Sequence, residues 1–351
     1  MNHNILISLS LFLSQFYVFS SGIPQPGHIV LALSIGLFFI TKNIKNKNEY
    51  SNILLILIFY ISLVNLIWSL LSSSTSYIIS LAYWIFNLIL FLYITNNNIN
   101  FNYIQKTILT SLIFMILIWA LGLGRYDFYP RYNGLFNDPN QMGFWVLCSL
   151  SIYLLKPNKY QILVLCLGLF LIILTMSRSA IVGILFIFIG YLLNSKFTIN
   201  AILLKTLSFM ALIISLSYIF IVSADEIQFI ADRLVETKMG EQAEIRGYTA
   251  LLKYPEYLFF GGGQGEYFRF SSTNHEIHST WAGLLFYYGI VGTSLFLFLL
   301  YKIFSQLYLH EKLIFLGPLI YGFSTYGART IIFWYLISLY INHIKSHKQI
   351  H

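Results

Sequence analysis

The sequence predicts an all-α polytopic membrane protein with about twelve transmembrane helices and a large external loop between the ninth and tenth. Hydrophobic residues make up 58% of the 351 residues and charged residues only 10%, with a mean hydropathy of +0.73. That composition lies outside the range of soluble domains. Apolar runs also recur along the chain, many of them near the ~20 residues that an α-helix needs to cross a bilayer. Lysine and arginine, moreover, are segregated between alternate turns, as expected of a chain that crosses a membrane repeatedly.

The apolar runs define the twelve predicted spans. They cover residues 5–21, 27–41, 52–71, 76–95, 107–124, 142–155, 160–176, 180–194, 202–222, 279–301, 313–328 and 330–344. Two of the shorter ones, 142–155 and 313–328, require tilting, extension by their flanks or a partly re-entrant path. With the N-terminus in the cytoplasm, odd-numbered spans lead out and even-numbered spans return.

The lysines set this orientation. Twelve of the fourteen fall in cytoplasmic turns, as the positive-inside rule requires. These twelve are Lys42, Lys45, Lys47, Lys106, Lys156, Lys159, Lys196, Lys205, Lys302, Lys312, Lys345 and Lys348. The opposite orientation would place all of them outside, so we reject it.

All seven arginines fall on the external side, against the same rule. They are Arg125, Arg131, Arg178, Arg233, Arg246, Arg269 and Arg329. A guanidinium group is permanently charged and binds phosphate or carboxylate through paired hydrogen bonds. The arginines therefore indicate anionic, phosphate-bearing substrates outside the cytoplasm. Ion pairing with the eleven external carboxylates is the alternative, and it suits Arg233, beside Asp232 and Glu236, better than Arg178.

Other features exclude several function classes. The net charge of +8 comes mostly from cytoplasmic lysines, so it indicates contact with anionic membrane lipid and no nucleic-acid partner. Cys148 and Cys166 lie in neighbouring spans and form no disulfide or metal pattern. There is no phosphate-binding loop or dinucleotide fingerprint, which argues against ATP-driven chemistry. The first span lacks a basic start and a small-residue cleavage site, so we expect it to be retained.

We expect one transmembrane domain over residues 1–351, with two substantial external segments. Residues 125–141 are rich in turn formers and aromatic residues. Residues 223–278 hold nine of the thirteen acidic residues, and their part 225–253 has apolar and charged residues at helical spacing. That spacing predicts amphipathic helices on the outer membrane surface. The glycines of 259–267 then end the helical pattern. Long ordered loops between spans are usually functional.

Arg178 is the first candidate site residue. Ser177 is a natural N-cap, so the eighth span begins at Arg178. Unpaired backbone N–H groups and the helix dipole favour an anion at such a position. A cation there is understandable if a phosphate binds beside it. The alternative is an arginine that extends towards the lipid headgroups.

His278 is the second candidate. It opens the tenth span at the outer face, and histidine is the natural general base near neutral pH. His275 and Glu276 invite a metal interpretation, but His275 and His278 have i, i+3 spacing with no third ligand nearby, so no metal is predicted. We expect His275 to be a surface residue.

Four segments in order resemble the superfamily of O-antigen ligases and O-antigen polymerases. They are RYNGLFNDPNQMG (131–143), TMSRSA (175–180), IRGYTALLKYPEYLFFGGGQG (245–265) and HSTWAGLLFYYGIVG (278–292). The last fits the ligase-type pattern of His, a small polar residue, nine residues, Gly, two residues and Gly. The resemblance covers roughly residues 125–295 directly, and the twelve-span layout extends it to the whole chain.

The resemblance implies a metal-independent membrane glycosyltransferase without a cofactor. It would act at the periplasmic face of the bacterial inner membrane on a glycan carried by undecaprenyl pyrophosphate. Arg131, Arg178 and Arg246 would bind the pyrophosphate, and His278 would be the catalytic base. Arg125, Arg269, Arg329 and His275 match no family motif and remain secondary candidates.

The chemistry of a pyrophosphate leaving group agrees with this residue set. Glycosidases need one carboxylic acid to protonate a poor leaving group and a second carboxylate opposite it. Pyrophosphate already leaves as a stable anion, so arginines to stabilise charge and one base to activate a hydroxyl are sufficient. Direct displacement would invert the configuration at the anomeric carbon.

The acceptor separates the alternatives. A polymerase transfers the chain to another lipid-linked repeat unit, and a ligase transfers it to the lipid A core. The bias towards Asn, Ile, Lys, Phe and Tyr favours a polymerase of O-antigen or capsular polysaccharide, with a chain-length regulator as a candidate partner. The His-Ser pattern favours a ligase. A transporter or flippase is a third possibility, although transporters place polar groups near the bilayer midplane in broken helices.

Overall fold

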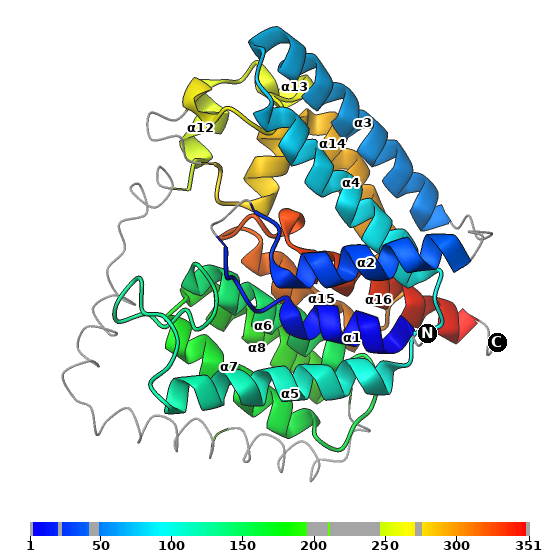
Figure 1. Ribbon diagram of the computed structural model, residues 1–351, viewed down its shortest axis with the longest axis vertical. Coiled ribbons are helices and arrows are strands. Elements are labelled where there is room, and N and C mark those ends of the chain that lie inside the picture. The colour runs from blue at the N-terminus through cyan, green and yellow to red at the C-terminus, as the bar shows by residue number, and fades with distance from the viewer. Residues whose placement is uncertain are drawn as a thin grey trace. The chain divides into compact units, whose positions relative to one another are not determined.

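The computed structural model describes residues 3–19, 23–41, 49–194, 210, 246–270 and 276–348. Within these ranges every regular element is a helix and no strand forms (Figure 1). The all-α prediction is confirmed for this part of the chain. The chain divides into two compact units, each described here by itself. The first unit comprises Met1–Ser34, Ile99–Thr237 and Tyr308–Tyr321, and the second comprises Ile35–Asn98, Lys238–Leu307 and Gly322–His351.

The helices of the two units alternate along the chain. Those of the first unit are α1 (His3–Leu13), α5 (Phe101–Ala120), α6 (Pro139–Tyr153), α7 (Gln161–Thr175), α8 (Arg178–Leu193) and α15 (Leu309–Tyr321). Those of the second are α3 (Glu49–Ser72), α4 (Ser76–Thr95), α12 (Tyr248–Lys253), α13 (Tyr257–Phe260), η1 (Tyr267–Arg269), α14 (Thr280–Phe304), η2 (Gly327–Arg329) and α16 (Ile331–Lys348). The boundary between the units falls within α2 (Pro26–Thr41).

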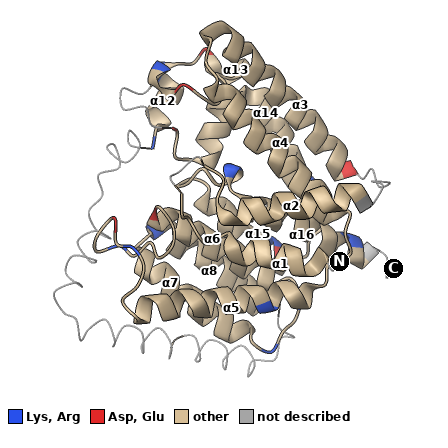
Figure 2. Ribbon diagram, viewed as in Figure 1, with Lys and Arg blue, Asp and Glu red and all other residues tan. Residues whose placement is uncertain are grey.

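Among the described residues, four helices are long and apolar enough to cross a membrane: α3, α4, α5 and α14. Their only charged residues are Glu49, Lys106 and Lys302. Figure 2 shows that charged residues lie mainly at helix ends and in connecting segments of the described chain. The shorter helices α1, α2, α7 and α8 are also apolar.

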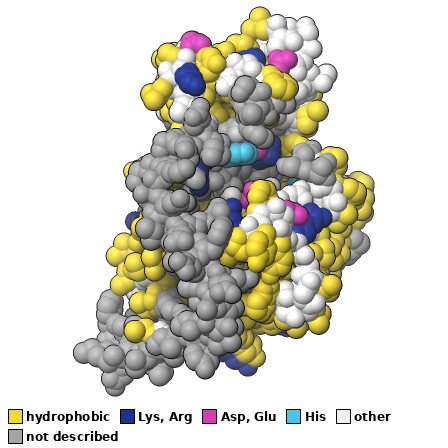
Figure 3. Space-filling view, turned by 90° about the vertical axis from the view of Figure 1, so that its left-hand side faces the viewer, with side chains coloured by type: hydrophobic (Ala, Val, Ile, Leu, Met, Phe, Trp, Pro, Cys, Tyr) yellow, Lys and Arg dark blue, Asp and Glu magenta, His cyan; other side chains and the backbone are white. Residues whose placement is uncertain are grey.

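The apolar character extends to the surface. In α3, Phe59 is 72% exposed and Leu70 is 81% exposed. Hydrophobic side chains cover much of the described surface in the view of Figure 3. Because a water-soluble protein rarely exposes contiguous apolar surface on this scale, these helices are those of a membrane protein.

The helices overlap eleven of the predicted spans, and of the ninth, 202–222, only residue 210 is described. Two of the helices end at least seven residues earlier than predicted. α1 ends at Leu13, whereas the predicted span runs to residue 21, and α15 ends at Tyr321, whereas the predicted span runs to 328. Gly322 and Gly327 explain the second difference, since glycine is a poor helix former whatever the hydropathy of its neighbours.

In the first unit, α8 and α15 pack closely through glycines. A Cβ added to Gly317 would lie 2.6 Å from the carbonyl oxygen of Gly183, and one added to Gly190 would lie 2.6 Å from that of His310. Small residues at such contacts let membrane helices approach backbone to backbone. These glycines therefore set the distance between α8 and α15.

This packing predicts different effects for two glycine-to-alanine changes. Gly190→Ala should lower the unfolding free energy by about 1–3 kcal/mol, because the new methyl group meets backbone that cannot rotate away. Gly36→Ala in α2 is the control, since a Cβ there meets nothing within 4 Å. Thermal unfolding of both purified variants in detergent measures the difference. Equal midpoints would contradict the proposed role of glycine between α8 and α15.

Candidate functional site

The predicted external segment 125–141 forms an ordered loop in the first unit. Arg125 N–H donates to Gly134 O at 2.9 Å, and Asn133 N–H donates to Arg125 O at 3.1 Å. Gly134 has φ of 59°, which the closed loop requires and glycine adopts without strain. Arg125 Nη1 donates to Asn137 Oδ1 at 2.8 Å, so this secondary candidate contacts its own loop.

Arg131 ties this loop to the end of α7. Its side chain is buried, with the residue only 8% exposed. Nε donates to the carbonyl oxygen of Thr175 at 2.9 Å, and Nη2 donates to Asn140 Oδ1 at 2.9 Å. Thr175 is the last residue of α7, and Asn140 lies in the first turn of α6. Arg131 thus joins the starting turn of one helix to the end of another.

The turn that Arg131 contacts is the one that leads to Arg178. Met176 has φ of 49° and ends α7, and α8 begins at Arg178 as predicted. The predicted side-chain cap by Ser177 is not formed. The Ser177 hydroxyl instead lies 3.1 Å from the hydroxyl of Tyr321. The Arg178 side chain is exposed at the first position of α8.

Tyr321 and Asn140 complete this cluster, and sequence reasoning did not single them out. The Tyr321 hydroxyl lies 3.1 Å from Asn140 O and 3.3 Å from Asn140 Oδ1, the atom that also accepts from Arg131. Asn140 N–H in turn donates to the N-cap carboxylate of Asp138. An Asp-Pro pair at a helix start could have indicated the cap, whereas nothing in the sequence indicates Tyr321.

In the second unit, His278 lies in the four-residue segment 276–279, and each of these residues is held by a hydrogen bond. Ile277 N–H donates to the Tyr287 hydroxyl at 2.8 Å, and His278 N–H donates to the Arg246 carbonyl oxygen at 3.1 Å. Ser279 caps α14, accepting from Ala282 N–H at 3.2 Å. Two further hydrogen bonds hold the ends of the segment. Glu276 accepts from Arg329, and the Ser279 hydroxyl accepts from the Tyr248 hydroxyl.

The His278 side chain is exposed although its backbone is held on both sides. Its neighbours Ile277 and Ser279 are buried, at 1% and 0% exposure. The backbone contact also places Arg246 next to His278, which brings two predicted site residues together within the second unit. The backbone of His278 is therefore fixed while its imidazole is accessible.

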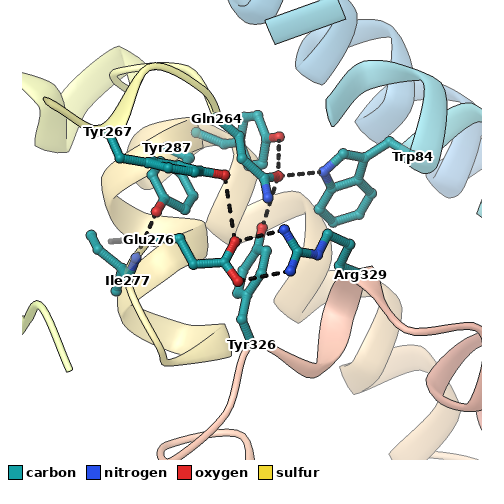
Figure 4. Close-up of polar contacts among 9 residues, drawn as sticks. Trp84, Gln264, Tyr267, Glu276, Ile277, Tyr287, Tyr326 and Arg329 are labelled. Carbon is teal, nitrogen blue, oxygen red and sulfur yellow. Dashed lines mark hydrogen bonds and ion pairs between the residues drawn. The ribbon is translucent and has the colours of Figure 1, made fainter. Parts of the chain in front are cut away.

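Glu276 is held by the most extensive of these contacts (Figure 4). Arg329 Nη1 donates to Glu276 Oε2 at 2.7 Å, and Nη2 donates to Oε1 at 2.8 Å. The Tyr267 hydroxyl donates to Oε2 at 3.4 Å. Burial raises the pKa of the Tyr267 phenol to about 12, and Glu276 adds to that rise, so Tyr267 keeps its proton near neutral pH. Burial by itself would lower the pKa of the Arg329 guanidinium. Glu276 and nearby tyrosines outweigh this effect and raise the pKa overall, so Arg329 stays charged.

Gln264 fixes the glycine-rich segment next to this ion pair (Figure 4). Its Oε1 accepts from Trp84 Nε1 at 3.1 Å, the Tyr288 hydroxyl at 3.0 Å and the Tyr326 hydroxyl at 3.2 Å. The residue is 1% exposed. Three donors from α4, α14 and the segment before η2 therefore converge on one amide oxygen.

Arg269, another secondary candidate, is enclosed by aromatic rings. Its guanidinium carbon lies 4.4 Å from the ring centre of Trp68, 5.2 Å from Tyr77 and 5.6 Å from Tyr257. It also donates to the carbonyl oxygen of Gly262. Cation–π contacts of this kind hold the η1 segment against α3 and α4.

The two glycines of the ligase-type pattern, Gly289 and Gly292, have a structural reason. Gly289 interrupts α14 with φ of 61° and ψ of −170°, a conformation that only glycine adopts readily. The carbonyl oxygens of Phe286 and Tyr287 then accept from Gly262 N–H and Gly263 N–H, each at 2.9 Å. Gly292 lies against Tyr60 and Tyr288 with no room for a Cβ.

His275 lies outside the described residues, as do 223–245 and 271–274 of the predicted loop 223–278. The predicted absence of a metal site at His275 and Glu276 thus stays a prediction. Glu276 is one of the eleven external carboxylates, but no local pattern pairs it with Arg329, because the two are 53 positions apart.

Comparisons with protein-family models and with curated proteins find no match to this chain. The proposed function therefore rests on the sequence motifs and on the geometry of the residues within each unit.

The Gly289 interruption predicts a large effect of one methyl group. In Gly289→Ala the new Cβ would overlap the carbonyl oxygen of Phe259 and require a strained backbone, so unfolding free energy should fall by more than about 2 kcal/mol. Gly122→Ala is the matched control, because Gly122 also has positive φ, of 67°, but its Cβ would meet nothing within 4 Å. Thermal unfolding in detergent compares them. A Gly289→Ala protein as stable as Gly122→Ala would refute the close approach.

Proposed function

We propose that this protein is a membrane glycosyltransferase that polymerises oligosaccharide repeat units linked to undecaprenyl pyrophosphate, for O-antigen or capsular polysaccharide. The observation that carries the proposal is His278, an exposed imidazole on a segment whose four residues are each held by another part of the second unit. The four motif segments that resemble the ligase and polymerase superfamily support it. No family match adds to this support.

In the proposed reaction, His278 accepts the proton of an acceptor hydroxyl group. The hydroxyl oxygen attacks the anomeric carbon of the donor, the bond from that carbon to the pyrophosphate oxygen breaks, and undecaprenyl pyrophosphate leaves as an anion. Because this leaving group needs no protonation, one base and a set of cations suffice. The product has the inverted anomeric configuration, and the step requires neither a metal nor a cofactor.

Arg178 and Arg246 are the proposed contacts to pyrophosphate. Arg178 is exposed at the start of α8, where backbone N–H groups also favour an anion. Arg246 lies beside His278 through the backbone contact of 3.1 Å. Arg131 donates to Thr175 and Asn140, which favours a contribution through the turn that carries Arg178.

We further propose twelve spans in the bacterial inner membrane, with the N-terminus in the cytoplasm and residues 125–141 and 223–278 in the periplasm. The distribution of lysines supports this topology. The bilayer would then both surround the helices and contain the undecaprenyl-linked donor.

A ligase that transfers the glycan to the lipid A core is the second candidate, favoured by the pattern His278-Ser279 followed by Gly289 and Gly292. A transporter is less well supported. The helices α3, α4 and α14 carry no charged residue away from their ends, whereas a solute pathway usually places such groups near the midplane.

The topology predicts opposite labelling of two introduced cysteines. With Cys148 and Cys166 replaced by Ala, Phe128→Cys should react with a membrane-impermeant maleimide in intact spheroplasts, and Lys159→Cys should react only after lysis. The two positions flank α6, which has only 15 residues. Labelling of both from the same side would show that α6 does not cross the membrane.

Surface polysaccharide from a deletion strain tests the reaction. Complementation with His278→Ala should restore no long glycan, and Arg178→Ala should lose about 10²–10³ in rate, as when one oxyanion donor is removed. His310→Ala, at a helix start in the first unit, is the control and should restore the wild-type ladder.

The glycan of the deletion strain separates the two candidate reactions. A core with one repeat unit in the deletion strain means polymerase, and bare core with unattached lipid-linked polymer means ligase. An unchanged ladder would refute the proposed function.

A further inference from the structure

The ion pair of Arg329 and Glu276 lies two residues from His278 and has no part in the proposed reaction. Both carboxylate oxygens of Glu276 accept from the Arg329 guanidinium group, at 2.7 and 2.8 Å. The two side chains are only 26% and 14% exposed. Such a bidentate contact fixes the direction of the carboxylate as well as its distance.

Arg329 is itself held in place by its neighbours. It ends η2, and the Thr330 N–H closes that turn by donating to Gly327 O at 2.9 Å. Trp334 Nε1 of α16 donates to Ala328 O at 2.7 Å, and Asn87 Nδ2 of α4 donates to Arg329 O at 3.4 Å. Arg329 is therefore a fixed point to which Glu276 is attached.

Glu276 is connected to His278 through a short segment outside any helix. Only Ile277 lies between them, and it is buried and bound to Tyr287. Because two residues span at most about 7 Å, the Glu276 anchor lies close to His278 along the chain and limits where its backbone can lie. The next residue, Ser279, is fixed as the N-cap of α14.

We infer that Arg329 and Glu276 are positioning residues that hold the His278 imidazole in its reactive place, and that Arg329 does not bind the donor pyrophosphate. The inference rests on the proposed function in treating His278 as the base. Glu276 occupies two of the five N–H donors of Arg329 and places a negative charge beside the guanidinium group, which opposes the binding of a second anion there. Arg178, by contrast, is exposed at a helix start with no acid near it in the sequence.

A double-variant cycle separates a positioning pair from an anion ligand. The proteins are Arg329→Gln, Glu276→Gln, the double variant, and the exchange Arg329→Glu with Glu276→Arg. Lys302→Gln is the matched control, because Lys302 and Glu49 form an exposed ion pair in the same unit at 3.3 Å. The substrate is the lipid-linked repeat unit isolated from membranes of the deletion strain.

For a positioning pair, both single variants lower kcat by about 10²-fold with KM unchanged, as expected for a displaced catalytic group. The double variant is no worse than either single one, the exchange recovers part of the activity, and Lys302→Gln behaves as wild type. For an anion ligand, Arg329→Gln raises KM while Glu276→Gln keeps or improves activity. That second result would overturn the inference.

A measurement that needs no substrate tests the positioning role independently of the proposed function. The rate at which diethyl pyrocarbonate modifies His278 is measured by peptide mass spectrometry on folded protein in detergent, with His310 as the internal reference. Loss of the ion pair should change the His278 rate and leave the His310 rate unchanged. Equal His278 rates in wild type and all pair variants would overturn the inference. If the deletion strain keeps a wild-type ladder, the proposed function fails, and these rates alone decide whether the pair positions His278.

Discussion

A helix in a membrane can break only where other protein groups or ordered water take over its hydrogen bonds, because lipid offers none. The second unit is organised around one such break. Gly289 interrupts α14, and the carbonyl oxygens of Phe286 and Tyr287 accept instead from Gly262 and Gly263. That docking places Gln264 where Trp84 and two tyrosines reach it, and it brings Arg269 against the aromatic rings of α3 and α4. The segment before α14, with His278, is held by the same region through Tyr287.

Much of the helical framework could be predicted from the sequence, because long apolar runs have few alternatives to a helix. The limits of α4 follow directly from hydropathy, and α8 begins after Ser177 as predicted. The early end of α15 could not be read from hydropathy, since Phe323, Tyr326 and Ala328 follow Tyr321 while Gly322 and Gly327 remove the helical preference. The Ser177 cap failed for a different reason: its hydroxyl lies against Tyr321, 144 residues away. The twelve-span count and the periplasmic loop remain predictions.

The external arginines illustrate how far residue type alone can lead. Charge pattern suggested anion binding for all of them, with ion pairing as the alternative. Arg329 follows that alternative, with Glu276 as its partner. Arg269 follows neither, because its guanidinium lies among Trp68, Tyr77 and Tyr257. Arg131 donates to a helix end and to an asparagine. Partners so distant in the sequence leave no local pattern, and this limits what a single sequence can assign.

The aromatic enclosure of Arg269 has a consequence for the conditions in which the protein works. Dissolved ions weaken contacts between exposed charges, and they do so over about 8–10 Å at physiological concentrations. A cation packed on aromatic faces and a partly buried ion pair are shielded far less. On the proposed topology this segment faces a compartment whose salinity follows the surroundings of the cell. The docking of Gly261–Gly265 is thus built from contacts that a change in ionic strength weakens little.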